Sequence, residues 1–261
     1  ICIYHSRDAD GWASGAIVKK KYTEAKLIGF DYGQKLPMEE IPEYEPIIMI
    51  DVSLPMEDMY ELGKHSGGNL TWIDHHISAI NDWKKFGNSF CTAVLENGIS
   101  ACEGAWKYLF PSEPMPIAVQ LLGEYDTWRN GDKQKWEKEI LPFQFGMRLY
   151  CNSVESFPTV LLGNDYGTAR TMIRQITDEG KIILKYQSQV NELQCKKSAF
   201  EYIFEGLRAI CLNGGGFNSD VFKSVYDESK HDIMMPFQFD GKQWTISLYT
   251  TKNEIYCSVI A

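Results

Sequence analysis

Four separated segments of the chain carry acidic and imidazole side chains in a pattern suited to binding metal ions. Hard divalent cations such as Mn²⁺ and Mg²⁺ prefer carboxylate oxygen with some imidazole nitrogen and no thiolate, and these segments offer that mixture. Two such ions about 3.5 to 4 Å apart lower the pKa of a shared water and stabilise the attacking and leaving oxygens at phosphorus. We therefore expect a two-metal site for phosphoester hydrolysis. The segments are His5-Ser-Arg-Asp8-Ala-Asp10-Gly11, Asp51 at the end of IIMID, Asp74-His75-His76, and Asp126 in GEYDTW.

Each segment also has a simpler structural interpretation. An Asp-x-Asp followed by Gly is most often a turn, and an apolar strand that ends in Asp is common in any α/β sheet. Asp126 lies in an aromatic setting and could simply cap a helix or form an ion pair. The Asp74-His75-His76 tripeptide is different, because it uses two of only five His in the chain. Paired His in a core are costly unless they hydrogen-bond or bind metal, so this motif favours the functional interpretation.

The first three segments follow stretches that we expect to be parallel strands. The first half of the chain alternates short apolar runs with amphipathic stretches, which is typical of an α/β fold. Residues 1–4, 46–51 and 70–74 are predicted strands, and residues 12–21 and 55–65 are predicted helices. In open α/β sheets, ligands bind beyond the carboxyl ends of the strands. The loops after the three strands should therefore meet in one crevice.

Size and composition indicate an ordinary folded protein. With 261 residues, 44% of them hydrophobic and 23% charged, the chain is long enough for one large domain or two smaller ones. No apolar stretch approaches the roughly 20 residues that cross a bilayer, and the N-terminal segment lacks the basic region and cleavage site of a secretory signal. Seven Cys without a CxxC pair fit a reducing compartment. We expect a soluble, cytoplasmic protein that does not act at a membrane.

The charge of the chain limits its partners. A formal net charge of -9 argues against a surface that grips long nucleic acid, because such affinity comes from many Lys and Arg contacts to phosphate. A phosphorylated substrate is still compatible, since carboxylates that bind divalent ions are counted in this sum. We therefore expect short substrates and no long duplex DNA.

Taken in order, the motifs resemble the DHH phosphoesterase superfamily, and the resemblance spans the chain. The shared pattern is a strand, then H..D.DG, a strand-terminal Asp, the DHH tripeptide and a helical Asp. One departure is that two residues separate His5 from Asp8, where many members have three. The fold that the resemblance implies is α/β, with a parallel-sheet DHH catalytic domain and a smaller α/β C-terminal domain joined by a helical linker.

The resemblance also implies a role for each residue of the motifs. It implies two bound divalent metal ions, Mn²⁺ in the first place and Mg²⁺ as the alternative. Asp51 would bridge the two ions, Asp74 would orient its loop, and His76 would face the scissile phosphate as an electrophilic or acid group. The other ligands would be His5 and Asp8 for one ion, and Asp10, His75 and Asp126 for the second.

The C-terminal part resembles the DHHA1 substrate-binding domain. The segments LNGGGFNSDVFKSV and QWTISLYTTKNEIYCSVIA fit its pattern of a strand, a Ser-containing helix start and a further strand. Tyr249 stands where an Arg is common, and the Gly-rich loop with a His that usually follows is absent, so we expect the natural protein to continue beyond Ala261. The predicted domains are 1–165 (DHH), 166–206 (a linker of one or two helices, with a candidate break at Gly180) and 207–261 (DHHA1-like).

The resulting hypothesis is a Mn²⁺-dependent phosphoesterase that hydrolyses short oligoribonucleotides or nucleotide phosphates by two-metal activation of water. Two alternatives stay open: an exopolyphosphatase that acts on polyphosphate, and a non-catalytic sensor that binds nucleotides. The aromatic residues of the C-terminal part permit base stacking without showing it. The sequence specifies neither the substrate, nor the polarity of attack, nor the oligomeric state, so a homodimer is also compatible.

Overall fold

The computed structural model describes residues 1–87, 89–163 and 165–260. The chain divides into two compact units, Ile1–Ile183 and Leu184–Ala261, and the boundary falls inside one long helix, α8 (Tyr166–Ser198). Within the described ranges, no helix combines the length and the apolar composition needed to cross a membrane.

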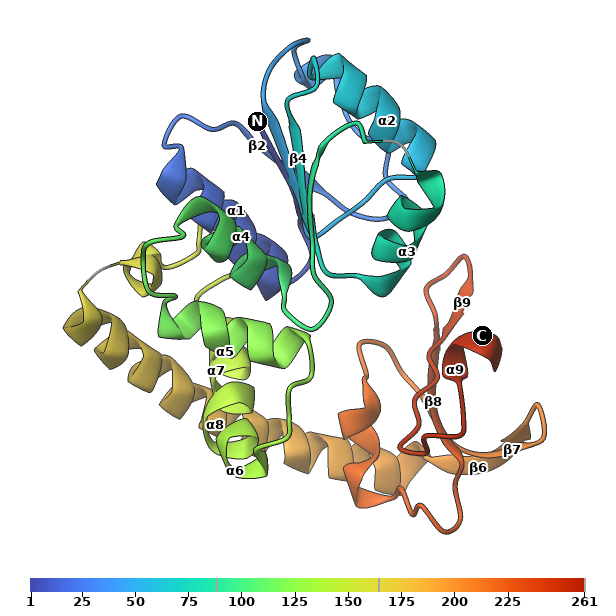
Figure 1. The fold of residues 1–261 in the computed structure, drawn as a ribbon. Helices are drawn as coiled ribbons and strands as arrows, with labels where there is room; N and C mark the ends of the chain where they lie inside the picture. The colour runs from blue at the N-terminus through green and yellow to red at the C-terminus, as the bar shows by residue number, and fades with distance from the viewer. Residues whose placement is uncertain (88, 164, 261) are drawn as a thin grey trace. The chain divides into compact units, whose positions relative to one another are not determined.

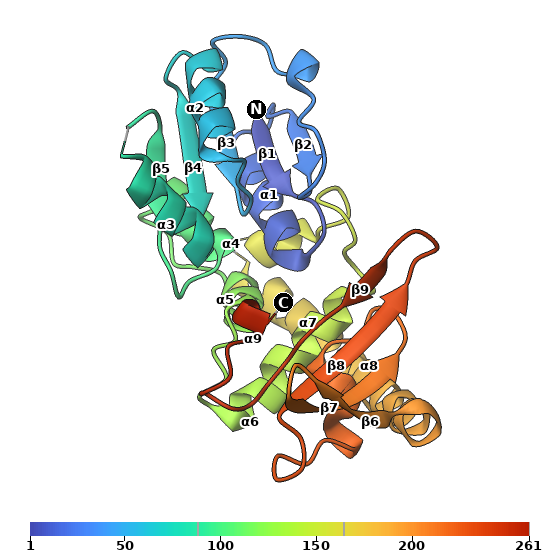
Figure 2. The same cartoon turned by 90° about the vertical axis from the view of Figure 1, so that its right-hand side faces the viewer.

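A five-stranded parallel sheet forms the centre of the first unit (Figure 2). In space the strands follow the order β2-β1-β3-β4-β5, and every neighbouring pair is parallel. Because β1 lies between β2 and β3, the strand order reverses at β1 and β3, where the ligand crevice of a doubly wound sheet is expected. The strands are β1 (Cys2–His5), β2 (Leu27–Phe30), β3 (Ile47–Ile50), β4 (Leu70–Asp74) and β5 (Thr92–Leu95).

Helices cover both faces of this sheet (Figure 1). α1 (Ala9–Lys21) and α4 (Ala101–Leu109) lie on one face, and α2 (Met56–His65) and α3 (Ile77–Phe86) lie on the other. On the second face, apolar side chains of β3 and β4 are buried against α2. Each large apolar side chain buried in this way contributes about 1.5 to 3 kcal/mol. This packing fixes the strand ends from which the candidate site is built.

The rest of the first unit is mainly helical. A break at Gly180 was predicted, but α8 continues through this residue, so the prediction of a break is wrong. A Cβ at Gly180 would collide with the carbonyl oxygen of Pro142, and a Cβ at Gly146 would collide with that of Ile176. The two glycines therefore allow the backbones of α7 (Leu141–Met147) and α8 to pack closely, without breaking α8. The elements are η1 (Met38–Glu40), α5 (Ile117–Asp126), α6 (Lys133–Lys135), the π-helical η2 (Trp136–Ile140), α7 (Leu141–Met147) and η3 (Thr159–Leu162).

The second unit contains a mixed four-stranded sheet in the order β6-β7-β8-β9. The outer pairs are antiparallel and the central pair β7-β8 is parallel. β6 occupies residues assigned above to the helical linker, because its aromatic and β-branched side chains favour a strand. The predicted α/β fold class, with a parallel-sheet domain and a second, smaller domain, is confirmed. The elements are β6 (Phe200–Phe204), β7 (Leu207–Asn213), η4 (Ser219–Ser224), β8 (Ile233–Phe239), β9 (Trp244–Ile246) and α9 (Cys257–Ile260).

Candidate metal centre

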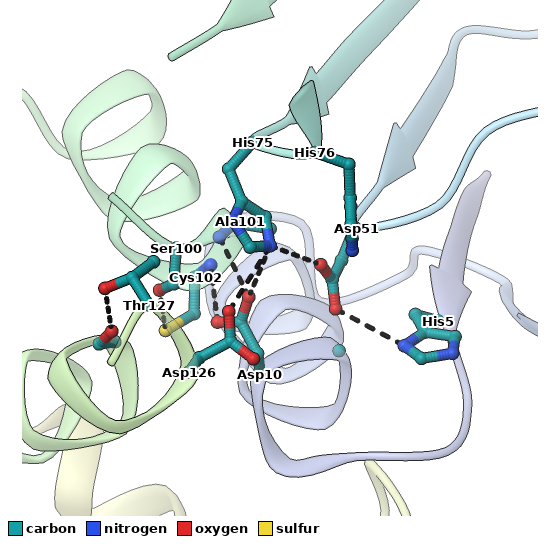
Figure 3. A network of polar contacts seen from close by, with 12 residues as sticks. His5, Asp10, Asp51, His75, His76, Ser100, Ala101, Cys102, Asp126 and Thr127 are labelled. Carbon is teal, nitrogen blue, oxygen red and sulfur yellow. Dashed lines mark hydrogen bonds and ion pairs between the residues drawn. The ribbon is translucent and has the colours of Figure 1, made fainter. Parts of the chain in front are cut away.

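The acidic and imidazole residues of the separated motifs meet at the carboxyl edge of the parallel sheet (Figure 3). His5 is the last residue of β1, Asp51 follows β3, and His75 follows β4. These strand ends open onto the point where the strand order reverses. Helices supply the remaining residues, from the start of α1 and the end of α5. The structure thus brings together every residue predicted as a metal ligand: His5, Asp8, Asp10, Asp51, His75 and Asp126.

The loop between β1 and α1 is folded tightly by two residues of the first motif. Asp8 caps α1, because its Oδ1 accepts a hydrogen bond of 3.0 Å from the N–H of Gly11. Gly11 packs on the end of β1, where a Cβ would collide with the carbonyl oxygen of His5. A residue with a side chain would therefore displace this loop. The glycine of the motif keeps Asp8 and Asp10 close to His5.

His5, Asp8 and Asp51 form one candidate ligand group. Ligand atoms from the three residues all lie within 4.8 Å of one another. His5 Nδ1 is 2.9 Å from Asp8 Oδ2 and 3.6 Å from Asp51 Oδ2. Burial acts to lower the pKa of His5, but hydrogen bonds to Asp51 and Asp8 outweigh it and raise this pKa to about 10. The imidazolium supplies the positive charge that a divalent cation would bring to the same carboxylates.

Asp10, His75 and Asp126 form the second candidate group. His75 Nε2 lies 3.3 Å from Asp126 Oδ2, 3.9 Å from Asp10 Oδ2 and 3.3 Å from Asp51 Oδ1. Burial acts to lower the pKa of His75, whereas the hydrogen bond to Asp51 and the charges of Asp10 and Asp126 raise it to about 9. Three carboxylates therefore converge on one imidazole nitrogen.

Asp51 connects the two groups, and only 2% of the residue is exposed. Its Oδ2 faces His5 and its Oδ1 faces His75, as the dashed lines in Figure 3 show. The backbone of Asp51 has a φ of 60°, in the left-handed region that Asp and Asn adopt more readily than most other side chains. The carboxylate is thus positioned to share its two oxygens between the groups.

The carboxylates of the centre are crowded in a way that a bound cation would relieve. Burial and the negative charge of Asp51 raise the pKa of Asp126 to about 6. Burial and the negative charges of Asp51 and Asp126 raise the pKa of Asp10 well above its usual value. Asp126 Oδ2 is buried and, apart from its 3.3 Å ion-pair contact with His75 Nε2, has no hydrogen-bond partner among the residues that the structure describes. A buried carboxylate oxygen without a donor is costly. Because the candidate ligand atoms are carboxylate oxygens and imidazole nitrogens, the residues present fit divalent cations such as Mn²⁺ or Mg²⁺.

Asp74 fixes the two imidazoles of the tripeptide. Its Oδ1 accepts hydrogen bonds from the backbone N–H of His75 at 2.7 Å and of His76 at 3.0 Å, and it lies 2.7 Å from His76 Nδ1. The hydrogen bond to Asp74 raises the pKa of His76. Asp51 and Asp74 also form a possible ligand group with both imidazoles. Three contacts occupy Asp74 Oδ1, which fits an orienting role for that oxygen. Asp74 Oδ2 is buried and has no hydrogen-bond partner among the described residues.

Solved structures of other proteins align over almost the whole chain, whereas no protein-family model and no curated protein matches it. An uncharacterized protein from Helicobacter pylori G27 aligns with a TM-score of 0.44 at 16% identity, over 97% of this chain and 85% of its own. A pGpG-specific phosphodiesterase from Vibrio cholerae aligns with a TM-score of 0.49 at 12% identity, over 97% and 83%. The DHH domain of a member of a family of ribosomal proteins aligns with a TM-score of 0.54 at 14% identity, over 95% and 73%. This chain has the DHH-domain fold. The resemblance noted in the sequence is therefore confirmed at the level of the fold.

Within this DHH-domain fold, the start of α4 holds the Asp10 carboxylate. The backbone N–H of Ala101 donates to Asp10 Oδ2 and that of Cys102 donates to Oδ1, each at 2.9 Å. A helix N-terminus favours negative charge, because its first N–H groups have no partner inside the helix. Asp10 is only 3% exposed, so these two bonds fix the direction in which its carboxylate points.

An ion pair joins the start of α4 to the end of α5. Glu103 Oε2 accepts from the N–H of Ser100 at 3.0 Å, and Ser100 Oγ accepts from the N–H of Glu103, which completes a capping box. Arg129 Nη2 donates to the same Glu103 oxygen at 2.6 Å. Arg129 follows the end of α5, which carries Asp126. The pair therefore links the two helix ends that position Asp10 and Asp126.

Replacing Arg129 by Met should lower the free energy of unfolding by about 1 to 3 kcal/mol and weaken the binding of divalent ions. The change leaves a buried Glu103 carboxylate without its cation, and the cost is moderated because the Arg129 side chain is 36% exposed. Urea denaturation with and without Mn²⁺ measures both effects. In the double variant Arg129→Met/Glu103→Gln, Gln can keep the capping box, so part of the loss should be recovered. An Arg129→Met protein with wild-type stability and metal affinity would contradict this role.

Asp31 and Tyr32 are neighbours of the centre that the sequence analysis missed. Asp31 Oδ1 lies 3.5 Å from His5 Nε2, and its Oδ2 lies 2.8 Å from Arg7 Nε. The rings of Tyr32 and His5 have centroids 5.9 Å apart. Asp31 directly follows the apolar strand β2, which is the same pattern that drew attention to Asp51. That pattern would have identified Asp31.

Without metal, the protein should lose thermal stability as the pH rises from about 6.5 to about 10. The pKa values of His75 and His5 are raised to about 9 and about 10, against about 6.5 in an unfolded chain. Their stabilising contribution is fully present below pH 6.5 and is lost as the pH rises through the folded-state values. Because a metal ion binds the deprotonated imidazole, the increase in Tm caused by Mn²⁺ should grow across this range. Calorimetry in EDTA and in Mn²⁺ at several pH values tests this, and a metal-induced shift that is independent of pH would count against it.

Proposed function

We propose that this protein is a Mn²⁺-dependent phosphoesterase that hydrolyses short oligoribonucleotides or nucleotide phosphates. The main support is the junction at Asp51, where two groups of oxygen and imidazole donors share one carboxylate at the carboxyl edge of a DHH-domain fold. Mg²⁺ is the alternative metal. In this proposal one ion is held by His5, Asp8 and Asp51, and the other by Asp10, Asp51, His75 and Asp126.

The chain contributes ligands whose positions are set before substrate binds. When bound, two divalent ions would lower the pKa of a water and neutralise the charge that develops at phosphorus. The helix cap at Asp8 and the α4 amides at Asp10 hold these two carboxylates in fixed directions. Ligands fixed in this way need little reorganisation during the reaction, which is the main source of electrostatic catalysis.

His76 is the proposed substrate-facing residue. Its Nδ1 is engaged by Asp74 at 2.7 Å, which leaves Nε2 for a substrate, and its side chain is 40% exposed. The hydrogen bond to Asp74 raises the pKa of His76, so the imidazole carries a proton more readily than a free one. A protonated His76 would donate a hydrogen bond to a phosphoryl oxygen or a proton to the leaving oxygen as the P–O bond breaks.

Assays of the metal-free protein with added ions test the proposal. The substrates are a diribonucleotide, a nucleoside 3′,5′-bisphosphate, a cyclic dinucleotide and polyphosphate, each with Mn²⁺, Mg²⁺ or Zn²⁺. We expect Mn²⁺ or Mg²⁺ to support faster turnover than Zn²⁺, because the ligand set lacks thiolate. Cys102 lies beside Asp10, but burial raises the pKa of its thiol well above the usual value. Turnover of polyphosphate alone would favour an exopolyphosphatase, and no turnover with any ion would favour a nucleotide-binding sensor.

Lengthening an oligonucleotide beyond a few residues should not tighten its binding. The chain has 26 basic and 35 acidic residues, so phosphates outside the centre would meet a surface with few spare cations. The log-log salt dependence should correspond to about one or two released ions, against the roughly six to ten of proteins with extended phosphate contacts. Binding of 2-mer, 5-mer and 24-mer RNA at two salt concentrations, with a catalytically inactive variant, measures this. Much tighter and steeply salt-dependent binding of the 24-mer would instead indicate a processive nuclease.

A further inference from the structure

A cavity of about 580 Å³ opens in the first unit between the loop after β2, the loop after β3 and α2. It therefore lies at the carboxyl edge of the sheet, which is also the edge of the candidate metal centre. Pockets of about 300 to 1,000 Å³ are typical of sites for small organic molecules. Its volume is thus sufficient for one component of a nucleotide.

The cavity adjoins the metal centre through its lining residues. Tyr32 lines the cavity, and its ring contacts the His5 ring with centroids 5.9 Å apart. The preceding residue, Asp31, lies 3.5 Å from His5 Nε2. Ser53, another lining residue, comes shortly after Asp51 in the loop that follows β3. A group in the cavity and a phosphate at the centre can therefore belong to one molecule.

The lining combines an apolar floor with a polar rim. Phe30, Leu36 and Leu62 are buried and supply apolar surface. Tyr32 is 51% exposed and lines the cavity, so its side chain supplies aromatic surface there. Lys35 at the rim forms no hydrogen bond or ion pair with any residue in the described ranges, and its three N–H donors are free for a ligand. These features suit a planar heteroaromatic group that has hydrogen-bond acceptors at its edge.

A second cavity of about 570 Å³ provides a comparison. It is lined by Lys19 and Lys20 near the end of α1 and by Leu27 at the start of β2. These residues belong to the opposite, amino edge of the sheet. A ligand there could not also reach the metal centre, so of these two cavities the one beside His5 is the candidate part of the active site.

We propose that the cavity beside His5 binds a nucleobase of the substrate whose phosphate lies at the metal centre. This inference rests on the proposed function and assigns its substrate class, a nucleotide in preference to inorganic polyphosphate. Polyphosphate has no apolar part to bury on the floor of the cavity, and its charge would be repelled by Asp58 and Glu61 in the lining. A base, in contrast, gains from both the aromatic ring and the apolar floor.

Matched substitutions in the two cavities test the proposal. Leu54 lines the cavity beside His5 and Leu27 lines the other cavity, and both side chains are partly buried. Leu54→Trp fills the proposed base site, whereas Leu27→Trp makes the same change at the far edge. The substrates are a diribonucleotide and an abasic dinucleotide with the same phosphodiester. Thermal unfolding of both variants shows whether they are folded.

We expect Leu54→Trp to raise the KM for the diribonucleotide by about tenfold, which corresponds to about 1.4 kcal/mol and lies within the range for one stacked base. The KM of Leu54→Trp for the abasic dinucleotide should stay at the wild-type value. Leu27→Trp should leave the KM values for both dinucleotides unchanged. A Leu54→Trp protein with wild-type KM for the diribonucleotide would overturn the assignment. A KM raised equally for both substrates would also overturn it.

Failure of the proposed function gives a different result. In that case the wild-type protein hydrolyses neither dinucleotide with any ion, and calorimetric binding of nucleoside monophosphates decides the role of the cavity. Binding that is at least about tenfold weaker in Leu54→Trp than in Leu27→Trp would support a base site. Equal binding by the two variants would exclude it.

Discussion

Replacing Asp51 by Asn should lower kcat by at least about 10³-fold and remove at least one bound divalent ion. This loss corresponds to several kcal/mol, the scale on which metal ions stabilise charge in a transition state. Asn is the matched substitution, because it has nearly the same shape as Asp and tolerates the left-handed backbone found at this position. The fold should therefore survive while the shared negative charge is lost. Single-turnover kinetics and metal analysis of the purified variant measure the two effects.

The control for Asp51 is Asp82→Asn, the same chemical change on the exposed face of α3. Asp82 is ion-paired with Lys85 at 3.1 Å and takes no part in the candidate centre. Exposed pairs of this kind contribute at most about 1 kcal/mol, so both kcat and metal content should be retained. If Asp51→Asn behaved like Asp82→Asn, the assignment of the metal centre would be wrong.

Replacing His76 by Ala should lower kcat by about 10² to 10⁴-fold while metal binding is retained. His76 lies beside the ligand groups, and its Nδ1 is already engaged by Asp74, so its removal takes away a donor to the substrate rather than a ligand. Metal analysis together with kcat at saturating substrate distinguishes the loss of a donor to the substrate from the loss of a metal ligand. The matched control is His65→Ala at the end of α2, where the imidazole contacts the carbonyl oxygen of Ile41. Loss of metal from His76→Ala would show that His76 is itself a ligand.

The pH profile of Asp74→Asn gives a second measure of His76. The hydrogen bond to Asp74 raises the pKa of His76, and an amide is a weaker acceptor than a carboxylate. The pKa of His76 should therefore fall in this variant. If protonated His76 is the active form, the decrease of kcat at alkaline pH should begin at a lower pH in this variant. A decrease that begins at the same pH would indicate that another group controls it.

Local patterns predicted the elements whose signals were strong. β3 and β4 are continuous apolar runs that end at a carboxylate, and both were expected at nearly these bounds. β5 (Thr92–Leu95) was not expected, because it is a short strand at the edge of the sheet and is only partly buried. β6 was included in the helical linker, because the helical spacing of apolar residues continues into Phe200. Edge strands carry a weak pattern, since only part of their surface packs against a core.

The residues that support the centre were harder to predict than the centre itself. Ser100 and Glu103 have the spacing of a capping box, which predicts a helix start but not that its amides hold Asp10. Nothing near Arg129 in the sequence points to Glu103, because the two residues meet only when α4 and α5 pack together. The cavity beside His5 likewise forms between loops that follow two different strands.

The sequence by itself determined the α/β class and the kinds of side chain, carboxylate and imidazole, that reach the carboxyl edge of the sheet. These follow from local causes: apolar runs form buried parallel strands, and the residue after each strand must lie at that edge. Only the tertiary structure decided which of these candidate ligands face one another. The contacts of Asp51 with His5 and with His75 depend on the placement of β3 between β1 and β4. Strand order and helix packing arise from contacts between distant segments, so no local pattern contains them.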